Sequence, residues 1–148
     1  MPTLLHDPAV RDSLRARVRT LRPDSERLWG RMTVDQMLWH VNQALRNSLG
    51  DFEPAMLRVP LPRPLLKFIA VRIPWPKGAP TAPEFTATSH YSFDAERDRC
   101  LALIERTTHR NIDEPGWGRS AAFGRMSGRD WSRLNAKHLN HHLKQFGV

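Results

Sequence analysis

Apolar residues recur with helical spacing in four separate segments of this sequence, at residues 8–21, 34–49, 95–108 and 128–146. In the first segment Val10, Leu14, Val18 and Leu21 fall on one face of a helix. No segment alternates apolar and polar residues over the length of a strand. The sequence therefore predicts an all-α fold. Because the chain has 148 residues, we expect a single domain over residues 1–148.

Capping residues mark the ends of the predicted helices. Thr33 and Gln36 have the spacing of a capping box before the second helix, and Ser127 and Asp130 have it before the last. Gly50 supplies a stop for the second helix. Four capped amphipathic helices with one long connection are typical of a four-helix bundle.

The long connection is the proline-rich crossover between the second and third helices, residues 51–93. Its eight prolines prevent a long helix, but residues 65–73 can form a short apolar helix between Pro64 and Pro74. Long connections in compact domains often cover functional sites. We therefore expect this segment to pack over the functional end of the bundle through its apolar side chains, which are Leu66, Phe68, Ile69 and Trp75.

Cysteine content and hydropathy give an expected location. The single cysteine, Cys100, excludes an internal disulfide and fits a reducing compartment. No run approaches the ~18 apolar residues of a membrane span, and the charged residues Asp7, Arg11 and Asp12 are not typical of a signal peptide. We expect a cytoplasmic protein with no membrane partner.

The net charge of +8 raises the alternative of nucleic-acid binding. The arginines, however, are spread along the chain. The densest group carries no interleaved aromatic residue and consists of Arg11, Arg15, Arg17 and Arg19. Without a recognition motif, we expect no nucleic-acid partner.

The last predicted helix contains three histidines, His138, His141 and His142. Residues three or four apart are neighbours on a helix surface, so either His141 or His142 could pair with His138. A helical projection places His142 and His138 inside the apolar sector and His141 on its boundary. The inward pair is therefore His138 and His142.

Two inward imidazoles need a partner, because burying an unsatisfied polar group is costly. One interpretation is a metal site, and the other is two core histidines bonded to neighbouring polar groups. No glutamate follows the first histidine, so the metalloprotease motif is absent. His40, in the second helix, lies on the border between the apolar and polar faces, a position compatible with pointing into a cleft.

Two strings of the sequence resemble the DinB/YfiT-like superfamily. Residues 32–40, MTVDQMLWH, resemble its second helix, and residues 137–147, KHLNHHLKQFG, resemble its closing helix. Residues 76–85 and 122–124, before Trp131, resemble an uncharacterised branch of this superfamily. The resemblance implies a four-helix bundle, often a homodimer, with a metal site of three histidines. Carried over to this sequence, the ligands are His40, His138 and His142.

The resemblance also implies a range of functions. Characterised members include thiol S-transferases, so we expect a metal-dependent enzyme acting on a small molecule, with a low-molecular-weight thiol as cosubstrate. The alternatives are a non-enzymatic metal-binding or stress-response protein and a metal-dependent hydrolase. Histidine ligands accept zinc, nickel or iron and so do not select one divalent metal.

Residues around the three histidines are further candidates. Cys100 lies on the inward stripe of the third helix with Leu101, Ile104 and Thr108, and we expect it to pack in the core. Polar side chains that could support the ligands are Asp35, Asn42, Asn135, His141 and Gln145. Tryptophans that could line a pocket are Trp39, Trp75, Trp117 and Trp131.

Overall fold

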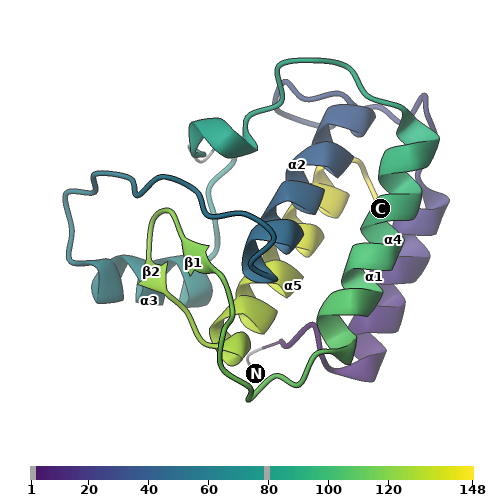
Figure 1. Cartoon of the computed structure of the whole chain (residues 1–148). Helices are drawn as coiled ribbons and strands as arrows, with labels where there is room; N and C mark the ends of the chain where they lie inside the picture. Colours follow the sequence, from purple (N-terminus) through teal and green to yellow (C-terminus); the bar gives the residue numbers. More distant parts are fainter. Residues whose placement is uncertain (1–2, 79–80) are drawn as a thin grey trace.

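The computed structural model describes residues 3–78 and 81–148. Its elements, in chain order, are α1 (Pro8–Thr20), α2 (Val34–Ser48), α3 (Arg63–Arg72), the 3₁₀ turn η1 (Pro83–Phe85), α4 (Phe93–His109), β1 (Arg119–Ser120), β2 (Gly124–Arg125) and α5 (Gly128–Gln145) (Figure 1). The all-α prediction is confirmed, and each long helix ends within two residues of its predicted boundary. None of the helices in the described ranges is long and apolar enough to cross a membrane.

The caps explain why the helices begin where they do. Gln36 Oε1 accepts a bond from the backbone N–H of Thr33 at 3.0 Å. Ser127 Oγ accepts one from the backbone N–H of Asp130 at 3.1 Å, and the Asp130 carboxylate accepts one in return. These bonds satisfy N–H groups that have no partner inside the helix. Ser92 caps α4 in the same manner, so this helix begins two residues before the predicted start.

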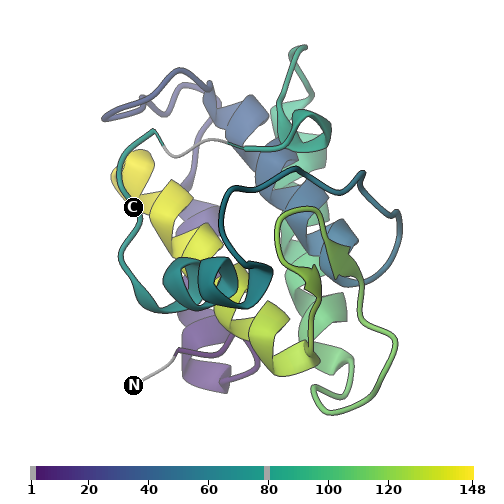
Figure 2. The same ribbon diagram turned by 90° about the vertical axis from the view of Figure 1, so that its left-hand side faces the viewer.

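The four long helices pack side by side around one core. Helix α1 contacts α4 and α5, and α2 also contacts α4 and α5 (Figures 1 and 2). The interior between them is apolar and includes Leu14, Val18, Met37, Leu38, Leu45, Ile104, Leu139 and Leu143. Burial of these side chains is the main stabilising contribution to the fold.

The inward face of α4 differs from the prediction. Cys100 and Ile104 are buried as expected, but Leu103 and Thr107 complete the buried face, while the expected Leu101 and Thr108 are partly exposed. The reason is that α4 packs against both α1 and α2, which widens its buried arc toward residues 103 and 107. The buried hydroxyl of Thr107 is satisfied by the carbonyl of Leu103 at 2.7 Å.

The segment between α2 and α4 contains α3 and η1. Helix α3 contacts α5, and η1 contacts α2. The antiparallel hairpin of β1 and β2 lies beside the first part of this segment (Figure 1), where Leu57 N–H donates to the carbonyl of Ala121 at 2.8 Å. The hairpin was not predicted, because strands of two residues are too short to show an alternating pattern.

Helix α3 forms where a short helix was expected, but its apolar stripe faces solvent. None of its residues is buried. Phe68 is 57% exposed and Ile69 is 38% exposed, so the expectation that these two side chains cover the functional end is wrong. Helix α3 is instead fixed to α5 by polar contacts, including an ion pair of 3.1 Å between Lys67 and Asp130.

Candidate metal centre

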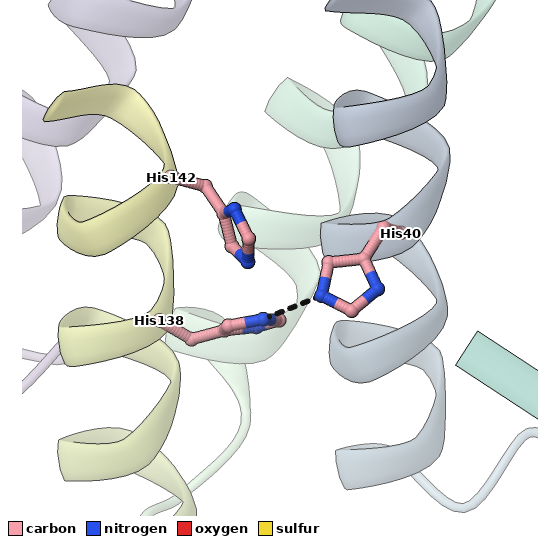
Figure 3. Close-up of side chains that lie close together, drawn as sticks. All are labelled: His40, His138 and His142. Carbon is pink, nitrogen blue, oxygen red and sulfur yellow. Dashed lines mark hydrogen bonds between the residues drawn. The ribbon is translucent and has the colours of Figure 1, made fainter. Parts of the chain in front are cut away.

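The structure brings His40, His138 and His142 together between two packed helices. His40 lies in the middle of α2, and the other two lie one turn apart on α5 (Figure 3). One ring nitrogen from each residue lies within 4.8 Å of the others. The Nε2 atoms of His40 and His138 are 2.9 Å apart, and the three ring centroids are 4.7 to 4.8 Å apart. We call these residues the histidine triad.

The crossover fixes the tautomer of His40. Nδ1 of His40 lies 2.6 Å from the backbone carbonyl oxygen of Phe85, in η1. A carbonyl oxygen only accepts hydrogen bonds, so Nδ1 carries the proton and donates it. Neutral His40 therefore directs the lone pair of Nε2 toward the other two rings.

A chain of two hydrogen bonds fixes the tautomer of His142. The side-chain amide of Gln145 donates through Nε2 to the backbone carbonyl of Trp29 at 2.9 Å. Because that carbonyl only accepts, the amide oxygen of Gln145 must face His142, and it lies 2.8 Å from Nδ1. Nδ1 of His142 then donates, and its Nε2 lone pair is free to bind a cation.

Burial keeps all three rings neutral at pH 7. Burial, followed by the charge of nearby His40, lowers the pKa of His142 to about 3. Burial, followed by the neighbouring histidines, also holds the pKa of His138 well below its ordinary value. The pKa of His40 is lowered by burial as well, although its bond to Phe85 acts in the opposite direction. Neutral imidazole is the form that binds metals.

The ring of Trp75 covers the triad on one side. The Trp75 ring lies 5.7 Å from that of His138 and 5.5 Å from that of His141. His138 itself is partly exposed, whereas His40 and His142 are buried. The crossover therefore packs at this end of the helices through Trp75 and Phe85.

His141 lies outside the triad. It is partly exposed, and its ring packs edge-on against those of His142 and Trp29, at 5.1 and 5.8 Å. This position agrees with its placement on the sector boundary by the helical projection. Its side chain packs beside the triad and is not one of the three proposed ligands.

Three of the proposed supporting residues act elsewhere. Asn135 donates to Ser48 Oγ at 3.0 Å, which ties α5 to the end of α2. The other two also make bonds within the framework: Asn42 donates to the Glu96 carboxylate, and Asp35 accepts from the backbone N–H of Tyr91. Of the five candidates, Gln145 alone hydrogen-bonds to the triad, and His141 packs beside it.

Most of the proposed pocket tryptophans also pack away from the triad. Trp39 stacks on Tyr91 with ring centroids 5.1 Å apart, and Trp131 donates to the carbonyl of Gly118. Trp117 packs against His6. Of the four proposed tryptophans, Trp75 is the one that reaches the triad.

Sequence reasoning missed two partners of the triad, the carbonyl of Phe85 and the carbonyl of Trp29. Both are backbone groups, which every residue possesses, so no residue type marks them. The only available signal was indirect: proline-rich and glycine-containing loops next to ligand-bearing helices.

Cys100 is fully buried in the core, as expected. Burial, followed by the charge of Glu96, raises the pKa of its thiol to about 12. A thiol in this state is protonated at neutral pH and unreactive. Cys100 is therefore a packing residue.

The chemistry of the triad fits a divalent cation. His40 and His142 each present a neutral Nε2 lone pair to the interior, and Nε2 of His138 lies 2.9 Å from that of His40. Converging lone pairs repel one another unless a proton or a cation lies between them. Three imidazoles suit zinc, nickel or iron and leave further coordination positions open.

These features define a class, the all-helical proteins whose packed helices can hold one metal ion on three histidines. The sequence profile of the DinB superfamily matches residues 8–146, and the chain belongs to this superfamily. The resemblance seen in the two histidine-bearing strings is thereby confirmed. No curated protein and no solved structure matches the chain.

Proposed function

We propose that this protein is a metal-dependent enzyme acting on a small molecule, with His40, His138 and His142 as ligands of one divalent ion. In this proposal α1, α2, α4 and α5 form a four-helix bundle of the DinB type, and the reaction is most concretely a thiol S-transfer. The observation that carries the proposal is the convergence of three neutral imidazoles, two of them held in the ligand tautomer by other parts of the chain.

Each surrounding group has a defined task in this site. Phe85 and Gln145 orient the rings of His40 and His142, and Trp75 excludes water from one side. In this proposal substrate enters beside His138, the one residue of the triad that is partly exposed. When bound, a divalent ion supplies Lewis acidity, which lowers the pKa of a thiol or water that reaches an open coordination position.

A cosubstrate thiol fits the residues of the chain, because Cys100 is too deeply buried to act as nucleophile. A thiol that enters from solution removes the need for a reactive side chain. The net charge of +8 favours an anionic thiol, such as one that bears carboxylates.

A second candidate function is non-enzymatic metal binding, for example in a stress response. Two of the hollows in the described part of the chain, of about 740 and 470 Å³, are not lined by any histidine of the triad. A protein that only sequesters or senses an ion needs no substrate pocket, so this observation favours the alternative. A metal-dependent hydrolase is the third candidate, with water in the role of the thiol.

The test begins with metal analysis of the purified protein. We expect about one divalent ion per chain. His40→Ala and His142→Ala should each lose most of it, and His141→Ala should retain it, since His141 lies outside the triad. Equal loss in all three variants would contradict the ligand assignment.

The reaction is tested by the rate of conjugation to an electrophile, with metal and thiol each varied and each omitted. We expect turnover that requires both and that survives Cys100→Ser. Turnover with metal but without thiol would identify a hydrolase. Metal binding without turnover of any thiol or ester would favour the non-enzymatic protein.

A further inference from the structure

A second candidate site lies away from the histidine triad. The hollow of about 740 Å³ is bounded by α1, α3 and α5 and is lined on α5 by Arg133, Ala136, Lys137 and Asn140. Arg133 lies on the side of α5 opposite to the triad, and Lys137 lies ~100° around the helix from His138, because each residue turns the helix by ~100°. The volume is in the usual range for small-molecule sites. We call this hollow the α1–α3–α5 groove.

The groove is lined by cations without matching anions. Arg17, Arg72, Arg133 and Lys137 line it, and none of its lining residues is acidic. Among the described residues, no carboxylate lies within ion-pair distance of Arg72, Arg133 or Lys137. Clustered like charges repel one another, so this arrangement favours an anion between them.

The hydrogen-bonding capacity of these cations is only partly used. Lys137 donates to the carbonyl of Ala70 at 2.6 Å and to that of Ile73. Arg17 donates to Asn140 Oδ1 at 2.9 Å and to the backbone oxygen of Val148 at 2.8 Å. Nε of Arg133 is buried and has no hydrogen-bond partner. Among the described residues, no hydrogen-bond partner is found for the guanidinium group of Arg72 or of Arg133, so both groups can bind an anion.

The groove also has an apolar side. Val10 of α1 and Val71 of α3 line it and are partly exposed, beside the polar residues Thr3, Ser13 and Asn140. Helix α3 has no buried residue, so its inner edge is incompletely packed against α1. An aliphatic body in the groove would gain about 25 cal/mol for each Å² of apolar surface removed from water.

We propose that the α1–α3–α5 groove binds a small anionic amphiphile, with its carboxylate at Arg72 and Arg133 and its aliphatic body between Val10 and Val71. Guanidinium groups match the planar geometry of a carboxylate. A medium-chain fatty acid is the simplest molecule with this chemistry. The proposal is independent of the function assigned to the triad.

The experiment is calorimetric titration of the full-length protein with decanoate, with 1-decanol and inorganic phosphate as matched probes. We expect saturable binding of one decanoate per chain. Decanol, which lacks the charge, and phosphate, which lacks the chain, should each bind at least about tenfold more weakly. Equal binding of decanol or of phosphate would overturn the proposal.

Variants locate the site. Arg133→Gln and Arg72→Gln should each weaken decanoate binding about tenfold, the loss expected for one charged hydrogen bond. Arg129→Gln is the matched control, because this arginine is also on α5 but is exposed and paired with Asp113. Unchanged binding in both Arg133→Gln and Arg72→Gln would overturn the proposal.

Two more variants separate the groove from the metal site. Ser13 is exposed and lines the groove, so Ser13→Trp should fill it without disturbing the core and should block decanoate. His142→Ala should lose metal but bind decanoate as before. Loss of decanoate binding in His142→Ala would show that the carboxylate binds the metal centre instead, which would overturn the groove assignment and leave the proposed function intact.

Discussion

Gln145 is the side chain that links the triad to the rest of the molecule. Its amide bonds to His142 on one side and to the backbone of Trp29 on the other. Since the Trp29 carbonyl accepts only, it decides which end of the amide faces the histidine. The loop between α1 and α2 therefore orients the Gln145 amide, and the amide in turn fixes which nitrogen of His142 carries the lone pair.

Gln145→Leu should weaken metal binding about 10- to 100-fold, the usual loss when a partner of a metal-bound histidine is removed. The leucine has a similar size but cannot hold Nδ1–H of His142. Competition with a coloured chelator measures the affinity. Lys144→Gln, an exposed neighbour on the same helix, is the control, and equal affinities in the two variants would refute the orienting role.

The neutral histidines predict how stability depends on pH. In the folded protein the pKa of His142 is lowered from 6.5 to about 3, and those of His40 and His138 are also lowered. Below pH ~6.5 the unfolded chain therefore binds more protons than the folded one, and stability falls as the pH falls. The loss continues toward pH 3, where His142 also protonates in the folded state.

Urea unfolding of the metal-free protein between pH 8 and pH 4 measures this effect. We expect the free energy of unfolding to be greatest near neutral pH and to decrease steadily below pH ~6.5. His142→Asn should make the decrease shallower, because one of the three groups is removed. A free energy that stays constant or rises between pH 6.5 and pH 4 would contradict the assignment of neutral rings.

Among the elements of the fold, two irregular segments orient the histidines that α2 and α5 bring together. The crossover supplies the carbonyl of Phe85 and the ring of Trp75, and the loop between α1 and α2 supplies the carbonyl of Trp29. This loop also donates from Leu28 N–H to the backbone carbonyl of Gln145 at 2.7 Å. The helices bring the three rings together, and the loops set their tautomers.

Gly30 is the position in this loop where a side chain would disturb Gln145. Its φ is +85°, which disfavours other residues, and a Cβ added there would lie 2.4 Å from Nε2 of Gln145. Gly30→Ala should therefore lower stability by about 1 kcal/mol or more and also weaken metal binding. Thermal unfolding and the chelator assay measure the two effects.

Gly78→Ala is the matched control for backbone strain, because Gly78 has a φ of +78° but no atom within 4 Å of an added Cβ. It should lose some stability and keep its metal affinity. If Gly30→Ala kept full metal affinity, the loop would have no part in orienting His142.

At the scale of the whole molecule, the exposed apolar stripe of α3 is the feature that the isolated chain leaves unexplained. Leu65, Phe68, Ile69 and Ile73 are between 38% and 57% exposed and lie on one face. Contiguous apolar surface of this kind commonly marks an interface. A second copy related by a two-fold axis would cover the same stripe on both chains, which agrees with the homodimer implied by the resemblance.

The homodimer is tested by light scattering coupled to gel filtration. We expect the parent protein to elute as a dimer and Phe68→Glu to elute as a monomer with unchanged metal content. Leu28→Glu is the control, since Leu28 is 70% exposed but lies outside α3. A monomeric parent protein at micromolar concentration would contradict the dimer.

Local patterns in the sequence predict the four long helices, their caps and the inward pair on α5. These features depend on residues three or four positions apart, such as Thr33 with Gln36 or His138 with His142, so local spacing is sufficient to reveal them. His40 was a border residue on spacing alone, and the family resemblance was needed to select it as a ligand.

Long-range packing, in contrast, sets the partners of the triad, the outward face of α3 and the groove between α1, α3 and α5. Phe85 lies 45 residues from His40 in the chain, and Trp29 lies 116 residues from Gln145. Contacts over such separations depend on how the helices pack. Backbone carbonyls are also common to all residues, so no sequence pattern identifies the ones that face the histidines.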